Sequence, residues 1–470
     1  MSFFTPESIR SASGGVFRSR VKRPSPAHGV GIDTRTLRPG QVFAAFRGER
    51  VDGHDFLEQA YEAGSRIALV ERDAEIRWHV PEDMALIEVE STRAALGRMA
   101  QAYRKTLTTA RVIAVTGSNG KTTTVRLIDQ VLGSHMAGSA SMKSYNNDIG
   151  LPLTLLNARR TDKYVVCEVG MSGPGEVARL AQIARPDIAV ITSIGRAHLG
   201  GLGSIESVGR EKAQLIRGLV PGGLAVVPAG IELLEDHLLH DGPMVRFGRD
   251  EAADLRISEV ESRADGVSFS TNGGQRYALG LLGGHNANNA AATIAVARRL
   301  GMSEPSIAEA LAHAKGPEMR LDRETIGRIS VVNDAYNANP DSVLAAIEAV
   351  GPGMADAERR VLVLGEMLEL GPASDDLHEE VGRAVASAIR GGRGPRLVVL
   401  VGAGAASARA PIEAELGPSG VVLEAETGDG RSIARRLRPG DAVLFKGSRS
   451  VGLERVVEVL RGEHGGPGDP

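Results

Sequence analysis

Hydrophobic and polar positions divide the chain into three successive stretches, and the first covers residues 1–108. A short apolar run at Val42–Phe46 predicts a strand, and apolar positions spaced three and four apart over Asp55–Ala63 predict a helix. A second helix is predicted over Thr92–Tyr103, where the apolar residues again fall on one face. This alternation predicts a small mixed α/β domain.

The second stretch, residues 109–317, alternates apolar runs with helical patterns, as a doubly wound and mostly parallel sheet does. Tyr164–Gly170 and Asp187–Ser193 are predicted strands, while the short runs and glycines of Leu255–Leu282 predict antiparallel hairpins. An alanine-rich helix is then expected to continue to about Leu300. We therefore expect a central α/β domain here.

The third stretch, residues 318–461, repeats the strand and helix alternation and predicts a Rossmann-like domain. No G-x-G-x-x-G dinucleotide fingerprint opens a helix after its first strand. A helix is expected after Pro372, and the other predicted elements are the strands Ile329–Val332, Val361–Leu364, Leu397–Val401 and Ala442–Phe445 and the helices Ser342–Val350 and Leu453–Leu460. Residues 462–470 have the composition of a disordered tail.

The strongest candidate for chemistry is Val112–Thr124, an apolar run followed by Thr-Gly-Ser-Asn-Gly-Lys-Thr-Thr-Thr. It predicts a strand, a phosphate-binding loop and a helix N-terminus, whose backbone N–H groups face phosphate oxygens. In this interpretation Lys121 reaches the terminal phosphates and the Thr122 hydroxyl holds Mg²⁺. The loop residues in the predicted nucleotide site are Gly117, Ser118, Asn119, Gly120, Lys121, Thr122 and Thr123.

The loop has the compact T-G-x-x-G-K-T form, because Val115 stands where the longer G-x-x-x-x-G-K-[ST] pattern has glycine. A glycine turn beside a surface lysine is the structural alternative. It would also have to explain the strand before the loop, the helix after it and the threonines at the junction. The loop predicts a nucleoside triphosphate and leaves the reaction open.

Two further polar residues follow predicted strands of the central stretch. Glu168 lies near the end of one strand and His198 shortly after the next. Ligands of open α/β sheets bind at the carboxyl ends of the strands, so both are expected beside the phosphate loop. Mg²⁺ prefers oxygen ligands, which suits Glu168, whereas a single histidine at a strand end is more often a hydrogen-bonded structural residue.

Composition excludes several classes of function. The formal net charge is −3, and no Lys/Arg cluster is interleaved with aromatic residues, so no nucleic-acid partner is expected. The single cysteine, Cys167, excludes a disulfide framework and a cysteine-based zinc site. No apolar run approaches the roughly 20 residues of a membrane span, and Met1–Pro6 lacks signal-peptide features. We expect a cytoplasmic protein without membrane insertion.

Taken together, these motifs resemble the Mur ligase family, which builds the peptide of bacterial cell-wall precursors. The similarity covers nearly the whole chain and is strongest to the member that adds a dipeptide. Besides the phosphate loop, four stretches carry it: Tyr145–Thr154, Glu168–Glu176, Asn333–Ser342 and Leu364–Gly371.

The resemblance implies roles for individual residues. Glu168 and His198 match magnesium ligands of the family. Lys212 matches a lysine that carries a carbamate, which would be a ligand of a second Mg²⁺. Without the resemblance, Lys212 would be interpreted as a solvated helix lysine. The remaining matches are Arg320 to an arginine on the γ-phosphate, Asn286 and Asn289 to adenine-contacting asparagines, and Asp334, Tyr336 and Asn337 to residues over the nucleoside.

In the first domain, Thr34, Arg35 and the stretch Arg47–His54 match the region that holds uridine diphosphate in the family. By pattern alone these are solvated turns around glycine. Asn146 and Asn147 match loop residues near the muramyl-peptide.

The implied activity is ATP-dependent amide formation through an acyl phosphate, joining D-Ala-D-Ala to a UDP-muramyl-tripeptide, with a monomer expected. A sister ligase that adds diaminopimelate or lysine is the alternative, but the diaminopimelate type carries Asp-Asn-Pro-Arg, which is absent here. Folylpolyglutamate synthase shares the compact phosphate loop but lacks a stretch like Asp334–Pro340. A nucleotide-dependent switch or binding module is the third alternative. Lys446 and Arg449 are candidates for the acceptor carboxylate.

Overall fold

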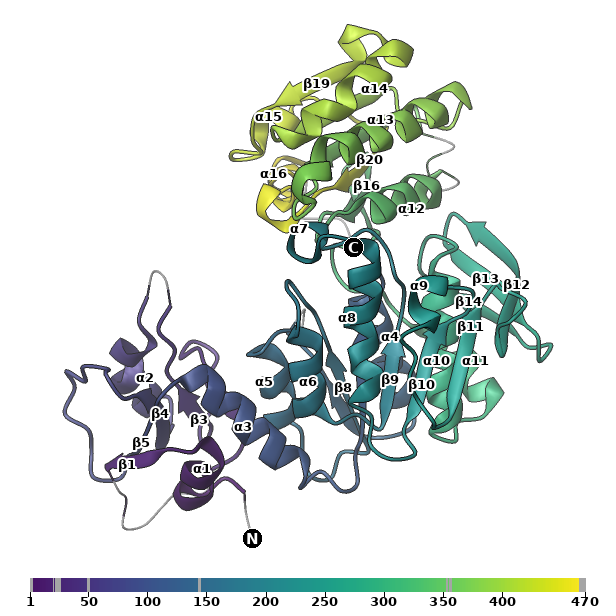
Figure 1. Ribbon diagram of the computed structural model, residues 1–470. Helices are drawn as coiled ribbons and strands as arrows, with labels where there is room; N and C mark the ends of the chain where they lie inside the picture. Colours follow the sequence, from purple (N-terminus) through teal and green to yellow (C-terminus); the bar gives the residue numbers. More distant parts are fainter. Residues whose placement is uncertain are drawn as a thin grey trace.

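A computed structural model describes residues 3–19, 21, 27–48, 51–142, 145–351, 354 and 357–464. Three β-sheets follow one another along the chain, and each forms a separate lobe with its own helices (Figure 1). The N-terminal lobe lies at one end of the central lobe, and the C-terminal lobe lies against another part of it. The predicted α/β class with three successive sheets is confirmed.

The N-terminal lobe is built on a five-stranded sheet of order β1-β5-β4-β3-β2, parallel except for β1. The strand predicted at Val42–Phe46 is β3, which ends at Ala44, and the helix pattern of Asp55–Ala63 is a 3-10 turn followed by α2. The elements are α1 Pro6–Ser13, β1 Val16–Ser19, β2 Val30–Gly31, β3 Val42–Ala44, η1 Gly53–Phe56, α2 Leu57–Glu62, β4 Ile67–Glu71, β5 Ala85–Val89 and α3 Thr92–Arg104.

The central lobe contains nine strands in the order β14-β13-β12-β11-β10-β9-β6-β8-β7. The strands from β7 to β12 pair in parallel, and β12, β13 and β14 form the antiparallel hairpins predicted for Leu255–Leu282. The strands are β6 Arg111–Thr116, β7 Gly138–Ala140, β8 Tyr164–Glu168, β9 Ile188–Ile191, β10 Leu224–Pro228, β11 Met244–Gly248, β12 Leu255–Arg263, β13 Gly266–Thr271 and β14 Arg276–Leu279.

Helices cover the central sheet, and α8 runs from the foot of this lobe towards the C-terminal lobe (Figure 1). The alanine-rich helix predicted to end near Leu300 is α10, which begins at Asn286 and ends at Arg299. The helices are α4 Lys121–Gly133, α5 Gly150–Leu156, α6 Glu176–Ala184, α7 Leu199–Leu202, α8 Ile205–Arg217, α9 Glu232–Glu235, α10 Asn286–Arg299 and α11 Glu304–His313.

Helix α3 connects the first two lobes through a shared apolar core. It buries Leu96, Met99, Ala100 and Tyr103 and packs against α5 and α6 of the central lobe. These side chains belong to one continuous cluster that also contains buried residues of β4, β8 and α6. The N-terminal and central lobes therefore share hydrophobic packing although their sheets are separate.

The C-terminal lobe has the strand order β15-β16-β20-β17-β18-β19, parallel except for β15. The predicted strands and helices are present, whereas β15, α14, β19 and α15 were not predicted from the sequence. The elements are β15 Asp322–Ile326, β16 Ile329–Asp334, α12 Pro340–Val350, β17 Arg359–Gly365, α13 Ser374–Arg390, β18 Leu397–Val401, α14 Arg409–Leu416, β19 Val421–Glu424, α15 Arg431–Ala434, β20 Asp441–Lys446 and α16 Glu454–His464.

The predicted tail begins too early, because α16 continues to His464 and so takes in the first part of the range 462–470. The apolar residues Val456, Val457 and Leu460 anchor this helix on the C-terminal core, which carries its last turn past the predicted boundary. Residues 465–470 lie outside the described residues. Over the part of the chain that is described, no helix has the length and apolar character needed to cross a membrane.

Candidate active site

The predicted phosphate loop lies between β6, which ends at Thr116, and α4, which begins at Lys121. Gly120 caps α4 with φ 83°, and a Cβ at this position would lie 2.3 Å from Asn289 Oδ1. A Cβ on Gly117 would lie 1.9 Å from Thr192 Oγ1. Both positions therefore require glycine, as their place in the motif predicts.

The loop after β9 fixes the shape of the phosphate loop. The backbone N–H groups of Ser118 and Asn119 donate to the carbonyl oxygen and the hydroxyl of Ser193, each at 2.9 Å. Ser118 Oγ donates to Gly195 O at 3.0 Å and accepts from Gly195 N at 2.9 Å. Ser193 was predicted only as the end of a strand, so its role as a support of the phosphate loop was missed.

Lys121 lies folded back on the loop that precedes it. Its Nζ donates to Gly117 O at 2.7 Å and is 3.4 Å from Ser118 O. Burial lowers the pKa of Lys121 to about 8, and the negative charge of Glu168 opposes this shift. An arriving phosphate would replace carbonyl oxygens with a full negative charge beside this amine.

A cavity of about 230 Å³ opens beside the phosphate loop and receives side chains from the central and C-terminal lobes. Met171 and Asn339 line it without having been predicted. The predicted residues along its wall are Ser118, Asn119, Gly120, Lys121, Asn146, Asn147, Glu168, His198, Arg320, Tyr336 and Asn337. Residues far apart in the sequence thus meet at the carboxyl ends of β6, β8 and β9.

Two buried oxygen atoms beside the cavity have no hydrogen-bond partner, Thr122 Oγ1 and Glu168 Oε2. The other carboxylate oxygen of Glu168 accepts from Asn146 Nδ2 at 2.9 Å. A hydroxyl and a carboxylate left without partners are the ligand types that Mg²⁺ takes together with phosphate oxygens and water. No group of three or more His, Cys, Asp or Glu side chains arranged for a metal occurs among the described residues, so these two oxygens would depend on the nucleotide for further ligands.

His198 is held from the opposite lobe. Its Nδ1 lies 2.6 Å from Glu369 Oε2, and this hydrogen bond lowers the pKa of Glu369 below its ordinary value. Gly200 N also donates to Glu369 O at 2.8 Å. Both His198 and Glu369 have positive φ, 61° and 63°. The contact joins the stretch after β9 to the sequence Leu364–Gly371, which the sequence analysis singled out without predicting this partner.

Lys212 is buried in α8 with a relative exposure of 1%. Among the residues that the structure describes, the polar contact of its Nζ is with Met171 Sδ at 3.8 Å, and Met171 lines the cavity. Burial lowers the pKa of Lys212 well below its ordinary value, and the nearby charge of Lys121 acts in the same direction. The sequence pattern alone indicated a solvated lysine. In the structure the amine of Lys212 is instead buried near the site.

Arg320 reaches the cavity from the segment that links the central and C-terminal lobes. Its guanidinium carbon lies 4.4 Å from the centre of the Tyr336 ring, and its Nε is buried without a hydrogen-bond partner. Met319 and Leu321 on either side have positive φ of 59° and 52°. Arg320 itself lines the cavity together with Lys121 of the phosphate loop.

Asp334 lies behind this wall, where its carboxylate is already paired. Lys446 Nζ is 2.9 Å from Asp334 Oδ2, and Leu321 N donates to Asp334 Oδ1 at 3.2 Å. Lys446 is 1% exposed and also donates to Asn337 O at 2.5 Å, so it is not free to bind an acceptor carboxylate. Arg449 stays exposed, with its guanidinium 5.9 Å from the Tyr336 ring centre.

The two asparagines predicted to contact adenine support the phosphate loop from behind. Asn289 Nδ2 donates to Asn286 Oδ1 at 2.8 Å, and Asn286 Nδ2 donates to Leu282 O at 2.7 Å. Thr124 Oγ1 donates to Asn289 Oδ1 at 3.3 Å and so connects α4 to α10. Asn286, Asn289 and Thr123 are buried and lie outside the cavity wall.

Thr34, Arg35, Arg47 and His54 lie in the N-terminal lobe, away from the cavity. Arg35 is exposed and forms a bidentate pair with Asp33, with a shortest distance of 2.6 Å. His54 is buried. Its Nδ1 lies 2.5 Å from Asp52 Oδ1, and its Nε2 accepts from Glu71 N at 2.9 Å. Both nitrogens are used inside the protein, so His54 holds the loop rather than facing a ligand.

Comparison with known proteins gives three family-model matches, one for each lobe. Residues 26–104 match "Mur ligase family, catalytic domain", residues 115–297 match "Mur ligase middle domain", and residues 319–449 match "Mur ligase, glutamate ligase domain". The UDP-N-acetylmuramoyl-tripeptide–D-alanyl-D-alanine ligase of Bacillus subtilis (strain 168) is 36% identical over 97% of this chain and 98% of the relative.

Solved structures agree with these matches. MurF from Acinetobacter baumannii has a TM-score of 0.79 at 28% identity and covers 97% of this chain and 98% of its own. MurF from Thermotoga maritima, solved in complex with ADP, has a TM-score of 0.75 at 27% identity over 93% of this chain and 98% of its own. With matches along all three lobes and a relative above 30% identity over almost the full chain, this protein belongs to the Mur ligase family.

Proposed function

We propose that the protein is an ATP-dependent ligase that joins D-alanyl-D-alanine to UDP-N-acetylmuramoyl-tripeptide in the synthesis of cell-wall precursors. The observation that carries this proposal is the cavity in which Lys121, Glu168 and Arg320 converge from two lobes. The substrates follow from the names of the relatives, which cover both chains almost completely. A sister ligase that adds a single amino acid is the alternative, and these relatives favour the dipeptide.

The reaction divides into two displacements. The terminal carboxylate of the donor peptide attacks the γ-phosphorus of ATP, which forms an acyl phosphate and releases ADP. The amine of the acceptor then attacks the acyl carbon, the amide bond forms, and inorganic phosphate and a proton leave. Lys121 and Arg320, which both line the cavity, would neutralise charge on the transferring phosphoryl group.

Thr122 and Glu168 are the residues that would hold Mg²⁺, since each keeps a buried oxygen without a partner. When bound, the ion would offset the negative charge of the nucleotide phosphates. His198 is placed beside this site by Glu369. Lys212 is proposed to carry a carbamate, formed from its neutral amine and CO₂ with release of a proton, which would create a carboxylate for a second Mg²⁺.

The remaining contacts follow from position. Tyr336 and Asn337, which line the cavity, are proposed to contact the nucleoside. The polar groups of three further residues are engaged within the protein, so these residues would support the nucleoside site without touching the ligand: Asp334, Asn286 and Asn289. Asn146 and Asn147 would meet the muramyl-peptide at the cavity rim. Thr34, Arg35 and Arg47 would hold the uridine diphosphate, with His54 fixing their neighbour Asp52.

The test is phosphate release by the purified protein in the presence of ATP and Mg²⁺. UDP-muramyl mono-, di- and tripeptides are each combined with D-Ala-D-Ala, with single amino acids and with glutamate. We expect release above background only for the tripeptide with D-Ala-D-Ala, together with the matching product mass. Preferred use of the dipeptide donor with a free amino acid would assign the protein to the sister activity. Release without any peptide substrate would instead indicate a nucleotide-dependent switch.

A further inference from the structure

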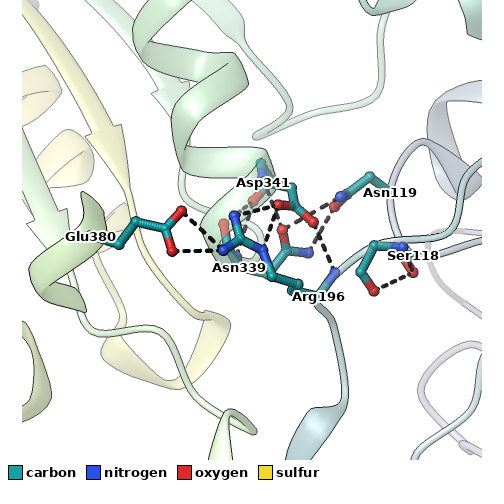
Figure 2. A network of polar contacts seen from close by, with 8 residues as sticks. Ser118, Asn119, Arg196, Asn339, Asp341 and Glu380 are labelled. Atoms are coloured by element: carbon teal, nitrogen blue, oxygen red, sulfur yellow. Dashed lines mark hydrogen bonds and ion pairs between the residues drawn. The ribbon is translucent and has the colours of Figure 1, made fainter. Parts of the chain in front are cut away.

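One arginine of the central lobe binds two helices of the C-terminal lobe. Arg196 lies in the loop between β9 and α7, and its Nε and Nη2 donate to Asp341 Oδ1 at 2.9 and 2.8 Å. Its Nη1 donates to both oxygens of Glu380, at 2.9 and 2.7 Å. Figure 2 shows the guanidinium between the two carboxylates. We call Arg196, Asp341 and Glu380 the ionic latch.

The geometry of the latch is specific. Asp341 lies in the first turn of α12, where the helix N-terminus favours a carboxylate, and its second oxygen accepts from the backbone N–H of Arg196 at 2.8 Å. Glu380 lies on α13. The three side chains are only 28%, 33% and 38% exposed. Planar guanidinium groups bind carboxylates in this multidentate way, which fixes orientation as well as distance.

The same loop that carries Arg196 also supports the phosphate loop. Its neighbour Gly195 exchanges two hydrogen bonds with Ser118, as described above. On the other side, Asn339, which caps α12, exchanges amide hydrogen bonds with Asn119 of the phosphate loop at 2.8 and 3.4 Å. The latch is therefore continuous with the phosphate loop through two short connections, as Figure 2 shows.

Besides the latch, the two lobes are joined at Glu369, which binds His198 Nδ1 at 2.6 Å and accepts from Gly200 N at 2.8 Å. The covalent link runs through the Met319–Leu321 turn. Apolar contact is limited to a few side chains, with Leu282 joining the C-terminal core and Leu199 packing against it. Interfaces of this polar kind between domains of one chain allow relative motion by default. A multidentate ion pair is then the contact best suited to select one orientation.

We propose that Arg196 is a positioning residue for phosphoryl transfer, which holds α12 and α13 so that Arg320, on the segment leading into the C-terminal lobe, stays in the cavity that Lys121 also lines. This inference rests on the proposed ligase function, but the arrangement of the lobes can be measured without activity. Misplacing a reacting group by about 1 Å costs on the order of 100-fold in rate. The backbone and Lys121 contacts to ATP would remain in place without the latch.

The experiment compares the full chain with Arg196→Gln, Arg196→Lys and the double variant Asp341→Asn/Glu380→Gln. The distance between lobes is followed by fluorescence energy transfer between labels on Arg217→Cys in α8 and Ser387→Cys in α13, both exposed positions. Cys167 is buried and does not compete for label. Arg383→Gln is the matched control, because Arg383 lies on α13 and pairs with Glu379 of the same helix.

We expect Arg196→Gln to broaden the distance distribution and to lower kcat by roughly 10-fold to 100-fold, while KM for ATP changes by less than about threefold. The double variant should reproduce this, and adding Arg196→Gln to it should change little further, because the residues act as one unit. Arg196→Lys should give a narrower distribution than Arg196→Gln. Arg383→Gln should match the wild type, and circular dichroism should show all variants folded.

Three results would overturn the proposal: an unchanged distance distribution in Arg196→Gln, a kcat equal to that of the wild type, or an Arg196→Lys variant no better than Arg196→Gln. A purely structural role would lower the melting temperature without separating kcat from KM. If the wild-type protein fails to ligate, the proposed function falls while the distance measurement still decides whether the latch exists.

Discussion

The central lobe meets its two neighbours through different mixtures of contacts. At the N-terminal joint, ion pairs such as Arg104 with Asp187 accompany an extensive apolar core. Helix α3 buries Leu96 and Met99 in this core, which it shares with α5 and α6. At the C-terminal joint, most of the described contacts are polar, with Arg196 between two carboxylates and Asn119 paired with Asn339. The burial of apolar surface contributes a large free energy but does not favour one orientation of the side chains. Ion pairs near water contribute little net free energy but fix the orientation of the groups they join.

The difference indicates which lobe moves during the reaction. Separating the N-terminal lobe would expose continuous apolar surface, so this lobe and the central one should behave as a single body. The C-terminal lobe can exchange its polar contacts for water at small cost. The proposed site of phosphoryl transfer lies at the second joint, and such a site must exclude water and then release products. The cavity lies at the polar joint, where Lys121 and Arg320 meet.

The largest effect is expected from Lys121→Ala at the polar joint. Ligation should fall by at least about 100-fold to 1,000-fold, because a preorganised cation on the phosphoryl group is lost. The melting temperature should stay near that of the wild type, since Lys121 acts on charge rather than packing. Lys105→Ala, at an exposed position after α3, is the control. Near-normal turnover of Lys121→Ala at saturating Mg²⁺ would contradict the assignment of the site.

Lys212→Ala tests whether the buried amine serves the site as a carbamate. Activity should fall on the order of 100-fold, and added formate or acetate should restore part of it by filling the vacated position. Lys163→Ala, an exposed lysine of the same lobe, should show neither the loss nor the recovery. Mass spectrometry under gentle conditions that finds only a bare amine in the active complex would exclude the carbamate.

Met99→Ala probes the apolar joint. Met99 is fully buried, so its truncation should lower the free energy of unfolding by about 2–5 kcal/mol. Urea unfolding should still follow one transition for the N-terminal and central lobes if they share a core. Met142→Ala, at a methionine that is 66% exposed, should change stability little. A separate, earlier unfolding transition of the N-terminal lobe would contradict the inference that this lobe and the central lobe form a single body.

The smallest effect concerns Cys167, which lies on β8 within the shared core. Burial raises the pKa of its thiol to about 12, so at pH 8 almost no thiolate is present and labelling by a thiol reagent requires opening of the core. Arg196→Gln should leave the labelling rate unchanged, whereas Met99→Ala should raise it. A rise in Arg196→Gln alone would mean that the polar joint also supports the core.

The sequence predicts what is local. The strand, glycine turn and helix around Lys121 follow from adjacent residues, and the strand ends that bring Glu168 and His198 to the same cavity follow from parallel-sheet geometry. Strands such as Leu397–Val401 are confirmed because their apolar runs are continuous. Short edge elements such as β15 and β19 carry alternating or mixed patterns and were missed.

Contacts between distant segments were beyond local pattern. Arg196 meets Asp341 and Glu380 across 145 and 184 residues of sequence, and nothing nearby indicates the pairing. Burial also changes the roles that were inferred for two polar residues. Lys446 looked like a candidate for an acceptor carboxylate, but its charge is held by Asp334. His54 uses both ring nitrogens inside the N-terminal lobe.

Backbone strain is concentrated where the C-terminal lobe meets the centre. Of the six non-glycine residues with positive φ among those described, His198, Met319, Leu321 and Glu369 belong to this joint. Each left-handed residue with a side chain costs about 1–2 kcal/mol. The unfavourable backbone thus lies at the joint where Arg320 enters the cavity. Met319 and Leu321 also pack against the apolar cores of the C-terminal lobe. Glycine at either position would relieve the backbone but lose this packing, so we expect Met319→Gly and Leu321→Gly to tolerate heat no better than the wild type.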